Sequence, residues 1–273
     1  MSRTVIGNPF DPAILAAEGE LPSFPEVADF DPAGTWLHTY RLVGARGFHG
    51  ENTAVGIIRM KRIAIGEDRF RLGIESRIVL QEAMENRVTA NAECSAGQPA
   101  TPLTWTHLSE HRGPEGNFFP RLRLKQEGET HNGRIKIDVD RHSYHPELSN
   151  PWTTEFVLFE SLQRLPFAGA PDIYFDLFED FSMVKRNQRL IYRGPRDFDL
   201  GEAGEHRLHR FDHIGSGIVP FEYYLDEAHR LLVAISGNKF LVLDDDERAH
   251  ATIEAFRERQ IGTYNWRQRN PAE

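Results

Sequence analysis

An alternation of apolar and polar residues over long segments is the feature that most constrains how this chain can fold. In "DRFRLGIESRIVL", residues 68–80, two sets of side chains alternate: Phe70, Leu72, Ile74, Ile78 and Leu80 against Arg69, Arg71, Glu75 and Arg77. Successive side chains of a strand point to opposite faces of its sheet. The segment therefore predicts a half-buried strand with its apolar face against a core.

Further strands are predicted on both sides of this segment. "RIKIDVD" repeats the alternation and follows "ETHNG", in which Asn132-Gly133 predicts a tight hairpin because both turn positions need a positive φ. Near the C-terminus, "IVPFEYYLD", "RLLVAIS" and "KFLVLDD" are separated by short turn sequences. That order is typical of a meander of antiparallel strands.

Two segments break the strand pattern and predict helices. "NPWTTEFVLFESLQRLP" offers Asn150 as N-cap, Pro151 as the first helical residue and Pro166 as a stop. "DERAHATIEAFRERQ" predicts an amphipathic C-terminal helix with Ile253 and Phe256 facing inward. The first helix carries a wide apolar face, so we expect a sheet to cover it.

The predicted fold is mainly β: one large, curved antiparallel sheet of roughly ten to twelve strands, forming a barrel or half-barrel. We expect one internal helix and one C-terminal helix. Residues 1–34 are rich in proline breaks and predict an irregular arm, with one helical turn near Ala13–Glu18, and residues 35–273 predict a single domain. Sheets with such long strands curl and often enclose a ligand cavity, packed at one end and open at the other.

Composition excludes several classes of protein. The 273 residues carry a formal charge of −9 with a pI near 5.8, which argues against nucleic-acid binding. Cys94 is the single cysteine, so no internal disulfide can form. No apolar stretch approaches membrane-spanning length. We expect a cytoplasmic protein as the sequence stands, or a periplasmic or secreted one if a signal peptide was removed.

The C-terminal half resembles a known group of proteins. The helix "FVLFESLQRLP" is followed by "LIYRG" and then by "GSGIVPFEYYLDEAHRLLVAISGNKFLVL". This order is similar to bacterial β-rich proteins of uncharacterised function that share the half-barrel of the lipoprotein localisation factors. The resemblance implies that fold and a hydrophobic or amphiphilic ligand. We expect the chain to depart from those proteins in its first residues, where neither an export signal nor a lipid-attachment cysteine is predicted.

Three predicted strands place aromatic and histidine side chains on one face. In "EHRLHRFDHIG" the alternation groups Arg207, His209, Phe211 and His213. Two other strands offer similar sets, which are Trp36, His38 and Tyr40 in one and Leu103, Trp105, His107, Ser109 and His111 in the other. We expect these faces to line one lumenal site for a small molecule, because aromatic walls with a few polar groups are typical of ligand pockets. The alternative is that these faces point to solvent.

Acid–base chemistry is a second hypothesis for the same residues. His209, His213, His107 and His38 are the candidate bases, and Tyr40 and Tyr144 the candidate acids. Tyr144 lies in "DRHSYHPE" and shares a face with His142 if the preceding strand continues; the alternative is a polar loop before Pro146. Such groups suit a lyase, an isomerase or a hydrolase.

No cofactor is predicted. A divalent metal bound by His209 and His213, with His38 or His107, is disfavoured because residues four apart on a strand lie about 13 Å apart. The sequence also contains no phosphate loop, dinucleotide fingerprint or nucleophile elbow. A third hypothesis is a scaffold without catalysis, in which aliphatic side chains fill the barrel.

Overall fold

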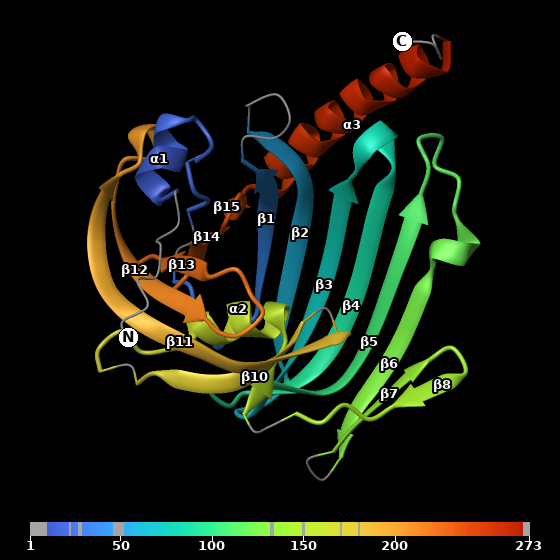
Figure 1. Ribbon diagram of the computed structural model, residues 1–273. Coiled ribbons are helices and arrows are strands. Elements are labelled where there is room, and N and C mark those ends of the chain that lie inside the picture. The colour runs from blue at the N-terminus through green and yellow to red at the C-terminus, as the bar shows by residue number, and fades with distance from the viewer. Residues whose placement is uncertain are drawn as a thin grey trace.

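The computed structural model describes residues 10–21, 23–26, 29–45, 52–131, 134–148, 151–169, 171–179 and 181–269. The described residues form fifteen strands in one sheet, which curves around a central helix (Figure 1). The mainly β fold predicted from the alternation is confirmed, and the strand number is higher than expected. Asn132-Gly133 and Asn150 lie outside the described residues.

All strand pairs are antiparallel except the one between β9 and β10. The spatial order is β8-β7-β6-β5-β4-β3-β2-β1-β15-β14-β13-β12-β11-β10-β9. The pairing of β1 with β15 therefore joins two meanders into one sheet, one made of β1 to β8 and the other of β10 to β15. The strands are β1 (Trp36–Gly44), β2 (Thr53–Ala64), β3 (Arg69–Val79), β4 (Glu85–Ser95), β5 (Thr101–Arg112), β6 (Leu124–His131), β7 (Arg134–Val139), β8 (His142–Tyr144), β9 (Trp152–Thr153), β10 (Ile173–Glu179), β11 (Met183–Asp199), β12 (Glu205–Ile214), β13 (Phe221–Leu225), β14 (Leu231–Ser236) and β15 (Lys239–Asp244).

The alternation in β3 shows why these segments form strands. Phe70, Leu72 and Ile74 are buried on the concave face, while Arg69 and Arg71 are exposed on the convex face. Each full burial of such a side chain contributes about 1.5–3 kcal/mol, which fixes the register of the strand.

Long, bent strands produce the curvature of the sheet. β11 has 17 residues, well beyond the usual strand length. Its pairing with β12 shifts register between Tyr192 and Gly194, and Gly194 has a φ of +91°. An extra residue at such a bulge bends the strand and increases its twist. Figure 1 shows β11 and β12 curving around one side of the interior.

Helix α2 (Glu155–Gln163) lies inside the curved sheet and confirms the predicted internal helix (Figure 1). Its start differs from the prediction, because Thr154 is the N-cap and accepts a hydrogen bond from the backbone N–H of Val157. Trp152 and Thr153 instead pair with β10 as β9. Every residue from Val157 to Gln163 is buried.

A buried ion-pair network fixes α2 to the sheet. The carboxylate of Glu160, which is 0% exposed, accepts hydrogen bonds from Arg62 Nε on β2 and from Arg164 Nε, each at 2.7 Å. Arg62 also donates to the backbone carbonyls of Ala33 and Gly34. The network therefore connects the helix, β2 and the segment that precedes β1.

Helix α3 (Asp246–Arg269) confirms the predicted C-terminal helix and packs on the convex face of the sheet. Its Ile253 is fully buried with Ile57 and Val79, and Phe256 packs against the same small cluster. Figure 1 shows the C-terminal part of α3 extending beyond the sheet. No helix in the described ranges is long and apolar enough to cross a membrane.

The arm before β1 contains a short helix, α1 (Pro12–Ala17), capped by Asp11. Leu15 of α1 is fully buried in the main core, so this part of the arm packs against the sheet. Three single-turn 3₁₀ helices lie in connections: η1 (Gln81–Ala83), η2 (Pro120–Leu122) and η3 (Gly201–Ala203).

Candidate lumenal binding site

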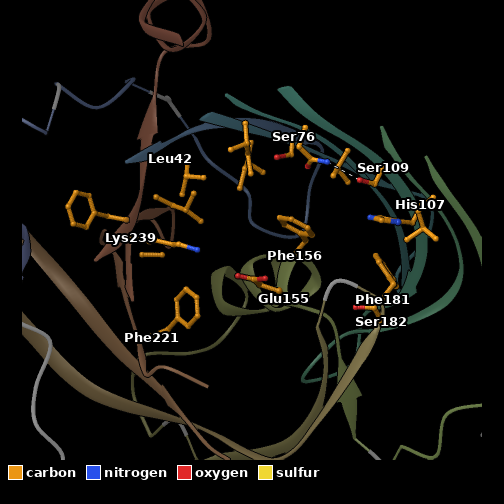
Figure 2. A pocket seen from close by; sticks show the side chains of 18 residues that line it. Leu42, Ser76, His107, Ser109, Glu155, Phe156, Phe181, Ser182, Phe221 and Lys239 are labelled. Atoms are coloured by element: carbon orange, nitrogen blue, oxygen red, sulfur yellow. Dashed lines mark hydrogen bonds between the residues drawn. The ribbon is translucent and has the colours of Figure 1, made fainter. Parts of the chain in front are cut away.

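A cavity of about 430 Å³ opens inside the curved sheet, beside the N-terminal end of α2 (Figure 2). This volume lies within the usual range for small-molecule sites. Strands from both meanders and the first turn of α2 supply its walls. The apolar part of the lining includes Leu42, Ile58, Phe156, Phe221, Phe240 and Leu241.

The cavity lies where the inward residues of β3 and β5 become smaller or more polar toward the C-terminal part of each strand. On β3, the buried Phe70, Leu72 and Ile74 are followed on the same face by Ser76. On β5, Trp105 is followed by His107 and Ser109. The interior around Phe70 and Trp105 is thus packed with large side chains, and the interior around Ser76 and Ser109 stays open.

Polar groups gather on the wall formed by β3, β4 and β5. The register places Ser76 and Ser109 opposite Val88, so both hydroxyls lie at one level of the sheet. Asn86 Nδ2 donates a hydrogen bond of 3.0 Å to Ser109 Oγ. His107 completes this wall and lies against the ring of Phe181, with 5.9 Å between ring centroids. The wall offers hydroxyl, amide and imidazole groups next to an apolar volume.

Two charged side chains point into the cavity (Figure 2). Glu155 stands in the first turn of α2, where the positive end of the helix dipole stabilises a carboxylate. Lys239 is the first residue of β15 and is exposed. The cavity thus has a carboxylate on the side of the helix and an ammonium at the start of β15.

Among the residues predicted as a shared site, His107 lines the cavity. Its neighbour on the same face, Trp105, lies in the core below, stacked on Phe181 with ring centroids 5.3 Å apart. The other predicted residues are absent from the described lining of this cavity. The structure therefore turns most of the predicted faces inward but does not bring them to one place.

The β1 set forms a separate aromatic cluster. His38 is buried, stacks on Trp36 with 4.6 Å between centroids, and has its Nδ1 3.4 Å from Tyr40 Oη. Burial lowers the pKa of His38 to about 3, and the Arg230 guanidinium lowers it further in the same direction. Burial also raises the pKa of Tyr40. Both groups are neutral at physiological pH.

The β12 residues divide between two places. His209 Nδ1 lies 2.7 Å from Tyr192 Oη, and its ring stacks on Phe167 at 3.6 Å between centroids. His229 stacks on the opposite face of Phe167 at 3.9 Å, so two imidazoles enclose one phenyl ring just after α2. Phe211 is buried next to this stack, 5.0 Å from the ring of Tyr192.

His213 is a core histidine with both ring nitrogens near a partner. Nδ1 lies 3.3 Å from Tyr223 Oη, and Nε2 lies 3.2 Å from Gln188 Oε1. Gln188 donates through its Nε2 to two backbone carbonyls, so its Oε1 is left to accept from the imidazole. Burial lowers the pKa of His213 to about 4, which keeps the ring neutral.

The two remaining candidates lie at the surface. Arg207 is half-exposed and pairs with Glu227 and Asp197. Tyr144 is 55% exposed on β8, a short edge strand, where the sequence also allowed a loop. Within the described ranges, no three His, Cys, Asp or Glu side chains form a group that could hold a metal ion.

Sequence reasoning missed most of the cavity lining. Ser76 interrupts the apolar side of the β3 alternation, and this break was the available signal for an opening in the core. The alternation did place Ser109 on the same face of β5 as His107, and both line the cavity. Glu155 and Lys239 gave no local signal, because their role depends on how α2 and β15 meet in the fold.

The fold and the cavity define a β-rich protein with a barrel-like curved sheet, an internal helix and a lumenal cavity. No protein-family model matches the chain, and no curated protein matches it. Among solved structures, the chain is similar to a β-barrel-like protein of Domain of Unknown Function DUF1849 from Brucella abortus. The TM-score is 0.49 at 10% identity, covering 78% of this chain and 99% of that one.

Proposed function

We propose that the protein binds a small amphiphilic molecule in the lumenal cavity. The observation that supports this most is the division of the lining: apolar side chains on most sides, and hydroxyl, amide and imidazole groups on the wall of β3 to β5. A cavity of this kind removes the apolar part of a ligand from water and pairs its polar part. The sequence resemblance to proteins with a lipoprotein-localisation-factor half-barrel implies the same class of ligand.

We favour binding without turnover over acid–base catalysis. Of the candidate acids and bases, His107 is the one on the cavity wall, and no tyrosine is among the described residues of the lining. An elimination or isomerisation would need a second group within reach of the same substrate atom. The scaffold hypothesis requires a filled interior, which an open volume of about 430 Å³ argues against.

The test is a fluorescence titration with the apolar dye N-phenylnaphthylamine, whose emission rises in an apolar site. Ser109→Trp places an indole in the cavity, whereas Thr106→Trp places the same group in a groove on the exposed convex face of the same strand. We expect the wild-type protein and the Thr106 variant to bind the dye, and the Ser109 variant to lose at least tenfold in affinity. Equal binding by both variants would place the dye elsewhere and refute the proposal.

A further inference from the structure

We infer that the ligand of the lumenal cavity is an anionic amphiphile, whose headgroup pairs with Lys239 while its chain lies along the apolar walls. This inference rests on the proposed function and adds the charge of the ligand and its orientation. Three features of the cavity carry it: the position of Lys239, the position of Glu155, and the chemistry of the remaining polar groups.

Lys239 is placed to meet a headgroup. It begins β15 opposite Gly44, the last residue of β1, and lines both the cavity and a neighbouring groove of about 500 Å³. Its ammonium makes no ion pair with any residue that the structure describes. Figure 2 shows the side chain pointing into the cavity. An anion there would gain a partner without breaking an existing ion pair.

Glu155 directs the anion away from the helix. The N-terminus of a nine-residue helix would attract a negative headgroup, but Glu155 already holds a carboxylate in that first turn. A ligand carboxylate beside Glu155 would be repelled, and one beside Lys239 would be attracted. The two charges therefore orient the ligand with its headgroup toward Lys239.

The other polar groups of the cavity do not replace the ammonium. Asn86 donates to Ser109 across the wall of β3 to β5, and both groups are uncharged. Opposite this wall, Phe156, Phe221 and Leu241 present apolar surface suited to an alkyl chain. The hydroxyl and amide groups of this wall tolerate a chain with a hydroxyl or carbonyl, whereas Lys239 is the lysine of the described lining and meets a full negative charge.

The test measures how well dodecanoate, dodecanol and dodecyltrimethylammonium displace N-phenylnaphthylamine from the full chain. We expect the wild-type protein to prefer dodecanoate over dodecanol by up to roughly fivefold, the range for an exposed ion pair. Lys239→Gln should remove that preference and leave dodecanol binding unchanged. Lys239→Glu should reverse it in favour of the ammonium ligand.

Lys61→Gln is the matched control, because it removes the same charge from the exposed convex face of β2. Its preference for dodecanoate should equal that of the wild-type protein. Equal dodecanoate preference in the wild-type and Lys239→Gln proteins, with normal dye binding, would overturn the inference and leave the proposed function standing. Failure of the dye and all three amphiphiles to bind the wild-type protein would overturn both.

Discussion

Replacing Glu160 by glutamine should remove the charge that holds α2 inside the sheet. The substitution keeps the size of the side chain and leaves two guanidinium groups, those of Arg62 and Arg164, without their carboxylate. The Arg62 side chain is only 3% exposed, so water cannot replace the lost partner. The Phe70 ring below Arg62 gives a weak remaining contact, with 4.6 Å from the guanidinium carbon to the ring centroid.

The expected cost is large because the Arg62 charge stays buried and the Arg164 charge stays mostly shielded from water. Removing one partner of a buried ion pair typically destabilises a protein by 3–5 kcal/mol. The glutamine carbonyl can still accept one hydrogen bond, so we expect a loss of about 3 kcal/mol. That is a large share of the roughly 5–15 kcal/mol by which proteins of this kind are stable.

Urea unfolding followed by tryptophan fluorescence measures this loss as a lower midpoint at an unchanged slope. Glu75→Gln is the matched control, since Glu75 is exposed and pairs with Arg59 across the convex face at 3.6 Å. Its effect should stay within about 1 kcal/mol. A Glu160→Gln protein as stable as the Glu75→Gln protein would refute the role assigned to the buried network.

Two further predictions concern stability. The pKa values of His38 and His213, about 3 and about 4, lie below the ordinary 6.5, so the unfolded chain binds protons that the folded protein does not. Stability should therefore fall by several kcal/mol as the pH drops from 6.5 toward 4, and His213→Gln should weaken this dependence; a constant urea midpoint would contradict it. Gly128→Ala should cost about 1–3 kcal/mol and perturb tryptophan emission, because its Cβ would lie 2.0 Å from Trp105 Cζ2. Gly73→Ala, whose Cβ meets its nearest atom at 3.5 Å, should change stability by less than about 0.5 kcal/mol, and equal effects of the two would refute the close packing.

The fold was largely predictable because local periodicity carried it. Inward apolar residues at every second position gave the strands and the curved sheet, and the polar–apolar pattern gave α3. The start of α2 was predicted wrongly because Trp152 and Thr153 pair with Asp176 and Leu177 of β10. That contact joins distant parts of the chain, so helix-capping rules applied to the local sequence could not detect it.

The candidate site was less predictable, because side chains that face the interior from different strands need not lie close to one another. His38, His107 and His209 stand on β1, β5 and β12, and β1 lies four strands from each of the other two. At about 4.8 Å per strand, four steps span about 19 Å along the sheet. Helix α2 fills the space between them, so single histidines join local clusters instead of one site.

Locating a bound amphiphile by a heavy atom would test the central claim most directly. A crystal of the protein soaked with dodecanoate brominated at its terminal carbon would reveal the bromine through its anomalous scattering. The account predicts a bromine peak inside the curved sheet, among Phe156, Phe221 and Leu241, with the carboxylate toward Lys239. A peak confined to the convex face, such as the groove around Ile63 and Gly73, would contradict a lumenal site.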